Sequence, residues 1–82
     1  MINISNDVYN RAAAITPSNT VDETEVFDAF LVGGAGNVAI VTEDRVATTL
    51  TGLLAGTVYR IRGRRVNVTG TTATSLVGLR FV

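Results

Sequence analysis

The sequence predicts an all-β fold: a small antiparallel β-sandwich or barrel-like domain with an extended N-terminal arm. Three observations support it. Thr and Val each occur 12 times among the 82 residues, and both favour strands. From residue 21 onward, β-branched runs alternate with glycine or acidic turns at spacings of about 8 to 12 residues. No segment has the 3.6-residue apolar repeat of an amphipathic helix. We therefore expect an arm over residues 1–20 and a β domain over residues 21–82.

The expected arm is polar, rich in Asn and Ser, and interrupted by Pro17. Within it, only Ala12 to Ile15 resembles a short extended segment. The β-branched runs of the domain then predict six strands, near residues 26–32, 37–42, 45–50, 57–62, 64–69 and 73–81.

Turn residues separate these strands. Glycines in 33–37 predict a hairpin turn, Glu43 and Asp44 predict a tight turn, residues 52–56 form a longer loop, and residues 70–72 close a last hairpin. The apolar alternation changes phase after residue 61, where Val66 and Val68 fall on the opposite parity. This slip predicts a β-bulge at or next to Gly63.

Alternation also predicts which side chains are buried. The expected core is Phe27, Leu31, Val38, Ile40, Val46, Leu50, Ile61, Val66, Val68, Val77, Leu79 and Phe81. Apolar residues on the other face of the first strand suggest a contact surface for another chain, and these are Val26, Phe30 and Val32.

The chain contains no His, Cys, Trp or Lys. A disulfide is therefore impossible, the usual zinc ligand sets are absent, and no Ser/His/Asp or Cys/His constellation can form. We expect no enzymatic activity and no cofactor or metal. A domain of this size buries a marginal core, so oligomerisation is the remaining means of stabilisation.

Seven Arg balance seven acidic residues, but the charges are segregated. Residues 1–41 carry a net charge of −4 and residues 42–82 carry +4. The two sets could pair within one chain, or an acidic edge of one subunit could meet a basic edge of the next. For the second case, the candidate interface residues are Asp22, Glu23, Glu25 and Asp28, which would face Arg60, Arg62, Arg64 and Arg65.

Other kinds of site are less well supported. The glycines of residues 33–36 could cradle a phosphate only if a helix followed, and a strand is expected there. The acidic group matches no calcium loop. Zero net charge and few aromatic residues argue against nucleic-acid binding by the arginines, and only Tyr9 and Tyr59 could stack on a sugar. No apolar run is long enough to span a membrane, and no signal peptide begins the chain.

Several segments together resemble the head-spike base proteins of tailed bacteriophages and of phage-like gene transfer agents. They are AAITPSNT at residues 13–20, FLVGGAGNVAI at 30–40, GLLAGTVYRIR at 52–62 and VNVTGTTATSLVGL at 66–79. The similarity extends from Ala12 to Phe81.

The resemblance implies a virion structural protein on the capsid surface, synthesised in the cytoplasm of a bacterial host. Such a subunit would form a homo-oligomeric ring, with a pentamer favoured, at a capsid vertex. Its partners would be the major capsid protein and a spike or fibre protein, and residues 1–11 would reach the capsid protein or a neighbouring subunit. The alternatives are a decoration or cement protein at threefold sites and a small tail or neck subunit.

Overall fold

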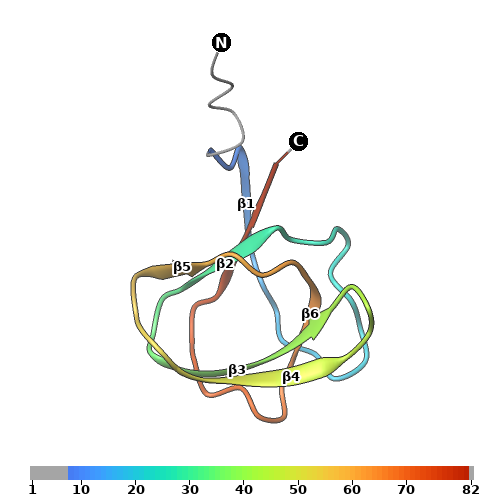
Figure 1. Ribbon diagram of the computed structural model, residues 1–82, viewed down its shortest axis with the longest axis vertical. Coiled ribbons are helices and arrows are strands. Elements are labelled where there is room, and N and C mark those ends of the chain that lie inside the picture. Colours follow the sequence, from blue (N-terminus) through green and yellow to red (C-terminus); the bar gives the residue numbers. More distant parts are fainter. Residues whose placement is uncertain (1–7, 82) are drawn as a thin grey trace.

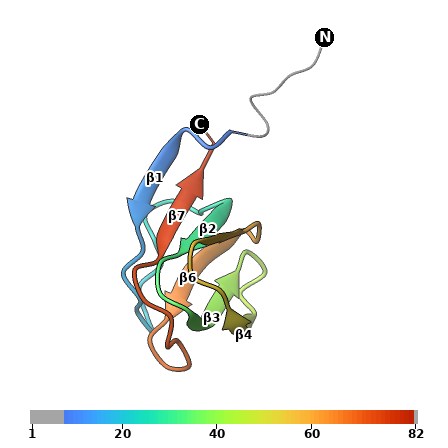
Figure 2. The same cartoon turned by 90° about the vertical axis from the view of Figure 1, so that its left-hand side faces the viewer.

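The computed structural model describes residues 8–81, which form two antiparallel β-sheets (Figures 1 and 2). The strand order is β1-β7-β2-β5 in the first sheet (sheet A) and β4-β3-β6 in the second (sheet B). The predicted all-β class is confirmed. The strands are β1 (Arg11–Ala14), β2 (Ala29–Val32), β3 (Gly36–Thr42), β4 (Ala47–Leu53), β5 (Thr57–Tyr59), β6 (Gly63–Asn67) and β7 (Val77–Arg80).

The six predicted strands all have counterparts, but two predicted hairpins are wrong. Residues 33–35 and 68–76 carry the chain from one sheet to the other, and β3–β4 is a true hairpin. Gly34 exchanges main-chain hydrogen bonds with Thr74, of 2.8 and 3.1 Å. A β carbon at Gly33 would lie 2.6 Å from the β carbon of Ser75. These glycines therefore permit close contact between two backbone segments and do not form a hairpin turn.

The predicted bulge next to Gly63 is confirmed. Val41 of β3 faces Arg65, whereas Thr42 faces Gly63, so Arg64 is the extra residue of β6. The bulge allows both Gly63 and Val66 to face the interior, where both are buried.

Both sheets contribute to one core, whose largest fully buried side chains are Phe27, Phe30, Val32, Val38, Ile40 and Val66. Four of the predicted core residues are therefore correct: Phe27, Val38, Ile40 and Val66. Three others are wrong, because Val46, Val68 and Phe81 are 52%, 54% and 39% exposed. The other five are half-buried, and these are Leu31, Leu50, Ile61, Val77 and Leu79. Two of them, Leu50 and Ile61, pack against the core.

The predicted contact surface on the first strand must also be corrected. Phe27 lies before β2, in an isolated bridge with Gly63, and the strand itself begins at Ala29. Phe27 and Phe30 therefore both face inward, in edge-to-face contact at 6.1 Å. Phe30 and Val32 have no exposed surface and cannot contact a neighbour, whereas Val26 is 38% exposed.

Part of the segment predicted as an arm belongs to the folded domain. β1 pairs with β7 along residues 11–14, and Ile15 is buried in the core. The ring of Tyr9 contacts that of Phe81, with centroids 4.5 Å apart. Residues 1–7 lie outside the described part of the chain. Within residues 8–81, no helix is long and apolar enough to cross a membrane.

Candidate subunit interface

Six of the eight predicted interface charges form ion pairs inside the chain, and three of these six meet in a cluster centred on Asp22. This residue lies in the loop between β1 and β2, and its carboxylate lies between two arginines of β6. Its Oδ2 is 2.7 Å from Nη2 of Arg64, and its Oδ1 is 3.0 Å from Nη1 of Arg65. The hydrogen bond from Arg64 is the main cause that lowers the pKa of Asp22. The charges of both arginines lower it further, while burial partly opposes them.

A second pair joins the start of β2 to the segment before β6. Nη2 of Arg62 lies 2.8 Å from Oδ1 of Asp28, and Nη1 lies 3.3 Å from Oε1 of Glu43. Hydrogen bonds to Asp28 and then Glu43 raise the pKa of Arg62. Oδ2 of Asp28 also accepts a 2.9 Å hydrogen bond from the main-chain N–H of Phe81. This carboxylate therefore links the segment before β6 to the residue that follows β7.

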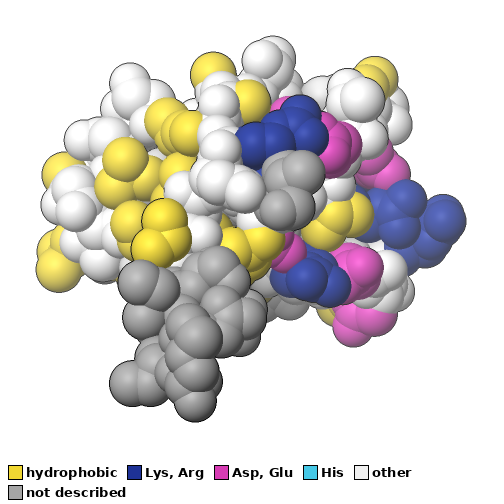
Figure 3. Space-filling model, turned by 90° about the horizontal axis from the view of Figure 1, so that it is seen from above, with side chains coloured by type: hydrophobic (Ala, Val, Ile, Leu, Met, Phe, Trp, Pro, Cys, Tyr) yellow, Lys and Arg dark blue, Asp and Glu magenta, His cyan; other side chains and the backbone are white. Residues whose placement is uncertain are grey.

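A third pair links Glu25 to Arg11 of β1, at 2.6 Å. Seen from above, acidic and basic side chains gather on one side of the molecule and hydrophobic side chains on the other (Figure 3). The segregated charges of the sequence thus meet within one chain, although exposed pairs of this kind add little stability individually.

Two of the eight predicted interface residues have no ion pair among residues 8–81. Glu23 uses its main-chain N–H to bond the carbonyl of Arg64, at 2.8 Å, and its carboxylate has no cationic partner there. Arg60 lies over the ring of Tyr9, 5.8 Å from the centroid. Arg45, in the β3–β4 turn, is likewise without an ion pair in this part of the chain, and the sequence interpretation did not single it out.

The loop over residues 16–24 covers the outer edge of β6. Ser18 and Glu23 donate 2.8 Å main-chain hydrogen bonds to Val66 and Arg64. Oδ1 of Asn19 accepts hydrogen bonds from the N–H groups of Val68 and Thr69. The sequence interpretation missed this role, because the loop residues carry no β pattern.

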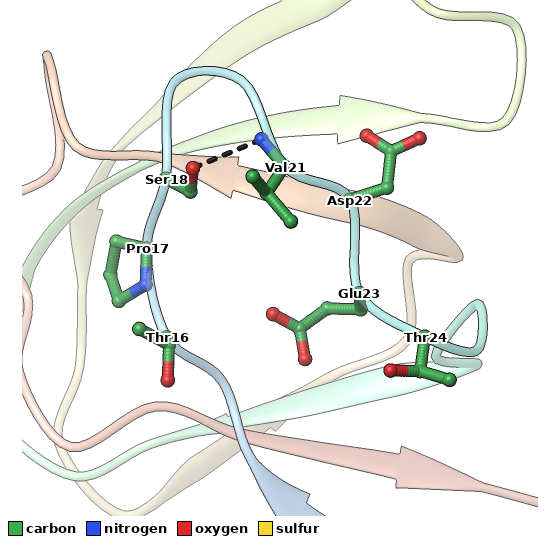
Figure 4. A pocket seen from close by; sticks show the side chains of 7 residues that line it. All are labelled: Thr16, Pro17, Ser18, Val21, Asp22, Glu23 and Thr24. Atoms are coloured by element: carbon green, nitrogen blue, oxygen red, sulfur yellow. Dashed lines mark hydrogen bonds between the residues drawn. The ribbon is translucent and has the colours of Figure 1, made fainter.

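The same loop encloses an open hollow of about 460 Å³ (Figure 4). The Oγ of Ser18 accepts a 3.0 Å hydrogen bond from the N–H of Val21 and fixes the bend of the loop. Among the described residues, no group of three or more His, Cys, Asp or Glu could hold a metal ion. The hollow is lined by Thr16, Pro17, Ser18, Val21, Asp22, Glu23 and Thr24.

The fold and the charged cluster define a small all-β structural module. No family model matches the chain, and no curated protein matches it. Among solved structures, a chain of "Capsid of native GTA particle computed with C5 symmetry" has a TM-score of 0.83 and 32% sequence identity. The match covers 93% of this chain and 88% of that chain.

This chain therefore belongs to the family of that capsid component of a gene transfer agent. The predicted resemblance is confirmed at the level of a capsid-related virion structural protein.

Proposed function

We propose that this chain is a non-enzymatic subunit on the outer surface of a phage-like capsid, where it forms the ring-shaped base of a spike or fibre at a vertex. The observation that carries the proposal is the match to a chain of a gene transfer agent capsid over 93% of this chain. The expected partners are copies of the chain itself, the major capsid protein and a spike or fibre protein.

The charge arrangement supports a protein partner over a nucleic acid. Three of the four clustered arginines, Arg62, Arg64 and Arg65, are paired with carboxylates of the same chain. Their charge is largely compensated, so few arginines are left to contact phosphates.

The ion pairs within the chain also reduce the number of charged residues that are left for contacts between subunits. Of the eight charged candidates, Glu23 and Arg60 keep side-chain charges without an ion pair among residues 8–81. We propose that Glu23 of one subunit faces Arg60 of the next. Val26, at 38% exposure, is the one residue of the predicted apolar trio that can add a nonpolar contact.

The solution mass of the purified protein tests the ring. Light scattering after size exclusion should give about 43 kDa, five times the 8.6 kDa chain. A discrete trimer of about 26 kDa, three times the chain mass, would contradict the pentamer and favour a cement protein at threefold sites.

A further inference from the structure

The two edges of sheet B differ, because another segment of the chain covers one edge and none of the described residues covers the other. The β6 edge is covered by residues 16–23, whose N–H groups bond the carbonyls of Arg64 and Val66. β4 is the opposite edge and pairs only with β3. Among the described residues, no main-chain segment covers its outer side.

β4 has neither charges nor proline, two of the features that normally protect an open edge, and its bulge lies only toward its C-terminal end, between Leu50 and Leu53. From Val46 to Tyr59 the sequence has no charged residue and no proline. Within the strand, five of seven residues are exposed, which leaves Leu50 half-buried and Leu53 buried. Monomeric proteins usually protect such edges with charges, prolines or bulges, because an open edge is a template for another strand.

The register identifies which groups face outward. Thr42 donates a main-chain hydrogen bond to Val46 at the hairpin turn, and Ala47 and Thr49 face Val41 and Ala39 of β3. Because hydrogen-bonded and non-hydrogen-bonded pairs alternate in an antiparallel ladder, the N–H and C=O groups of Ala47 and Thr49 point away from β3.

The sequence of residues 1–7, MINISND, has an alternating pattern suited to this edge, because Ile2 and Ile4 alternate with Asn3 and Ser5. The described chain begins at Val8, which is 57% exposed. β1 begins near the C-terminal end of the chain, while β4 lies at the opposite end of the molecule in both views (Figures 1 and 2). A copy's own β4 is therefore badly placed to receive this segment, whereas a second copy can present its β4 there.

We propose that residues 1–7 of one copy add as a strand to the β4 edge of the next copy. The inference rests on the proposed oligomeric function and names its contact. Each copy donates one strand and accepts one, which is a head-to-tail contact of the kind that closes into a ring.

Disulfide trapping in the full-length protein tests this pairing directly, because the natural chain has no Cys. The variant Ile4→Cys with Thr49→Cys should, on mild oxidation, give a ladder of covalent multimers up to the size of the ring, and a reducing agent should collapse it. The matched control is Ile4→Cys with Thr20→Cys, which places the second thiol at an exposed position of the loop that covers β6. The control should form multimers at least tenfold more slowly. Equal rates, or a cross-link confined to single chains, would overturn the proposal.

A second variant separates the edge from the fold. Thr49→Pro removes an outward N–H and leaves the hydrogen bonds to β3 intact. The variant should therefore fold but form a smaller oligomer than the wild type. Thr49→Lys, which places a charge on the same edge, should act similarly. Either variant retaining the full oligomer would contradict strand donation.

The outcomes also distinguish this inference from the proposed function. A wild-type protein that forms rings but gives no Ile4–Thr49 cross-link would refute the strand donation alone. A wild-type protein that is monomeric and absent from particles would refute the proposed function itself.

Discussion

Gly63 and Phe27 exchange two main-chain hydrogen bonds of 3.0 Å, and the Phe27 ring occupies the space beside the Gly63 Cα. The bridge ties the segment before β2, in sheet A, to the first residue of β6, in sheet B. It fixes how the two sheets meet, and it places the bulge that brings Arg64 and Arg65 to Asp22.

Gly63→Ala should therefore destabilise the domain. A β carbon at this position would lie 2.5 Å from Cζ of Phe27 and 2.9 Å from Cδ1 of Ile40. Overpacking of this kind costs about 1–3 kcal/mol of unfolding free energy. Urea unfolding measures this loss. Gly78→Ala is the matched control, because a β carbon at Gly78 would lie 3.2 Å from its nearest neighbouring atom. Equal losses for the two variants would contradict this packing.

Arg45→Gly should stabilise the β3–β4 hairpin. Arg45 has φ of 68°, in the left-handed region that glycine adopts without a steric penalty. Relief of this strain should add about 0.5–1 kcal/mol to the unfolding free energy. The control Arg45→Ala removes the charge but keeps the β carbon, so it should not increase stability. A gain in both variants would indicate a charge effect.

The ion pairs of Asp22 with Arg64 and Arg65 should make the free energy of unfolding depend on pH in the acid range. Arg64 and Arg65 lower the pKa of Asp22 from 3.8, so the folded state favours the ionised carboxylate. The contribution is present well above pH 3.8 and is lost as the pH falls below it toward the folded-state pKa.

Chemical unfolding of wild type and Asp22→Asn between pH 7 and pH 3 measures this contribution. The wild type should be more stable at pH 7, and the difference should shrink below about pH 4. Arg64→Gln, which removes the other half of the main hydrogen bond, should reduce the same pH dependence. A difference that stays constant over this range would show that Asp22 acts without its charge.

Charge reversal tests the proposed contact between Glu23 and Arg60 of neighbouring subunits. Arg60→Glu should weaken the association of copies about tenfold, which is about 1.4 kcal/mol, because two carboxylates would then meet. Adding Glu23→Arg should restore the affinity. Arg45→Glu makes the same charge change elsewhere and should leave association unchanged. Additive losses in the double variant would rule out the pairing.

Local patterns in the sequence predicted the features that depend on neighbouring residues. The phase change around Gly63 predicted the bulge, because strand side chains alternate strictly between two faces. The same rule failed for Phe30 and Val32, because the chain turns between Phe27 and Ala29 and both phenylalanines enter the core. Alternation cannot reveal that the strand begins at Ala29, three residues later than expected.

Features that depend on the order of strands could not be predicted. The charge segregation left pairing within and between chains equally open, because no local pattern shows that the 16–24 loop lies beside β6, where Asp22 meets Arg64. The open edge of β4 is a property of sheet B as a whole, because it depends on which strand lies on each side.

The most direct test of the central claim is the location of the protein on particles. Particles purified from cells with and without the gene should be compared by electron cryomicroscopy. The proposed function predicts a ring of five domains at the fivefold vertices in the first map and its absence from the second. No difference at the vertices, or a difference confined to threefold sites or to the tail, would contradict it.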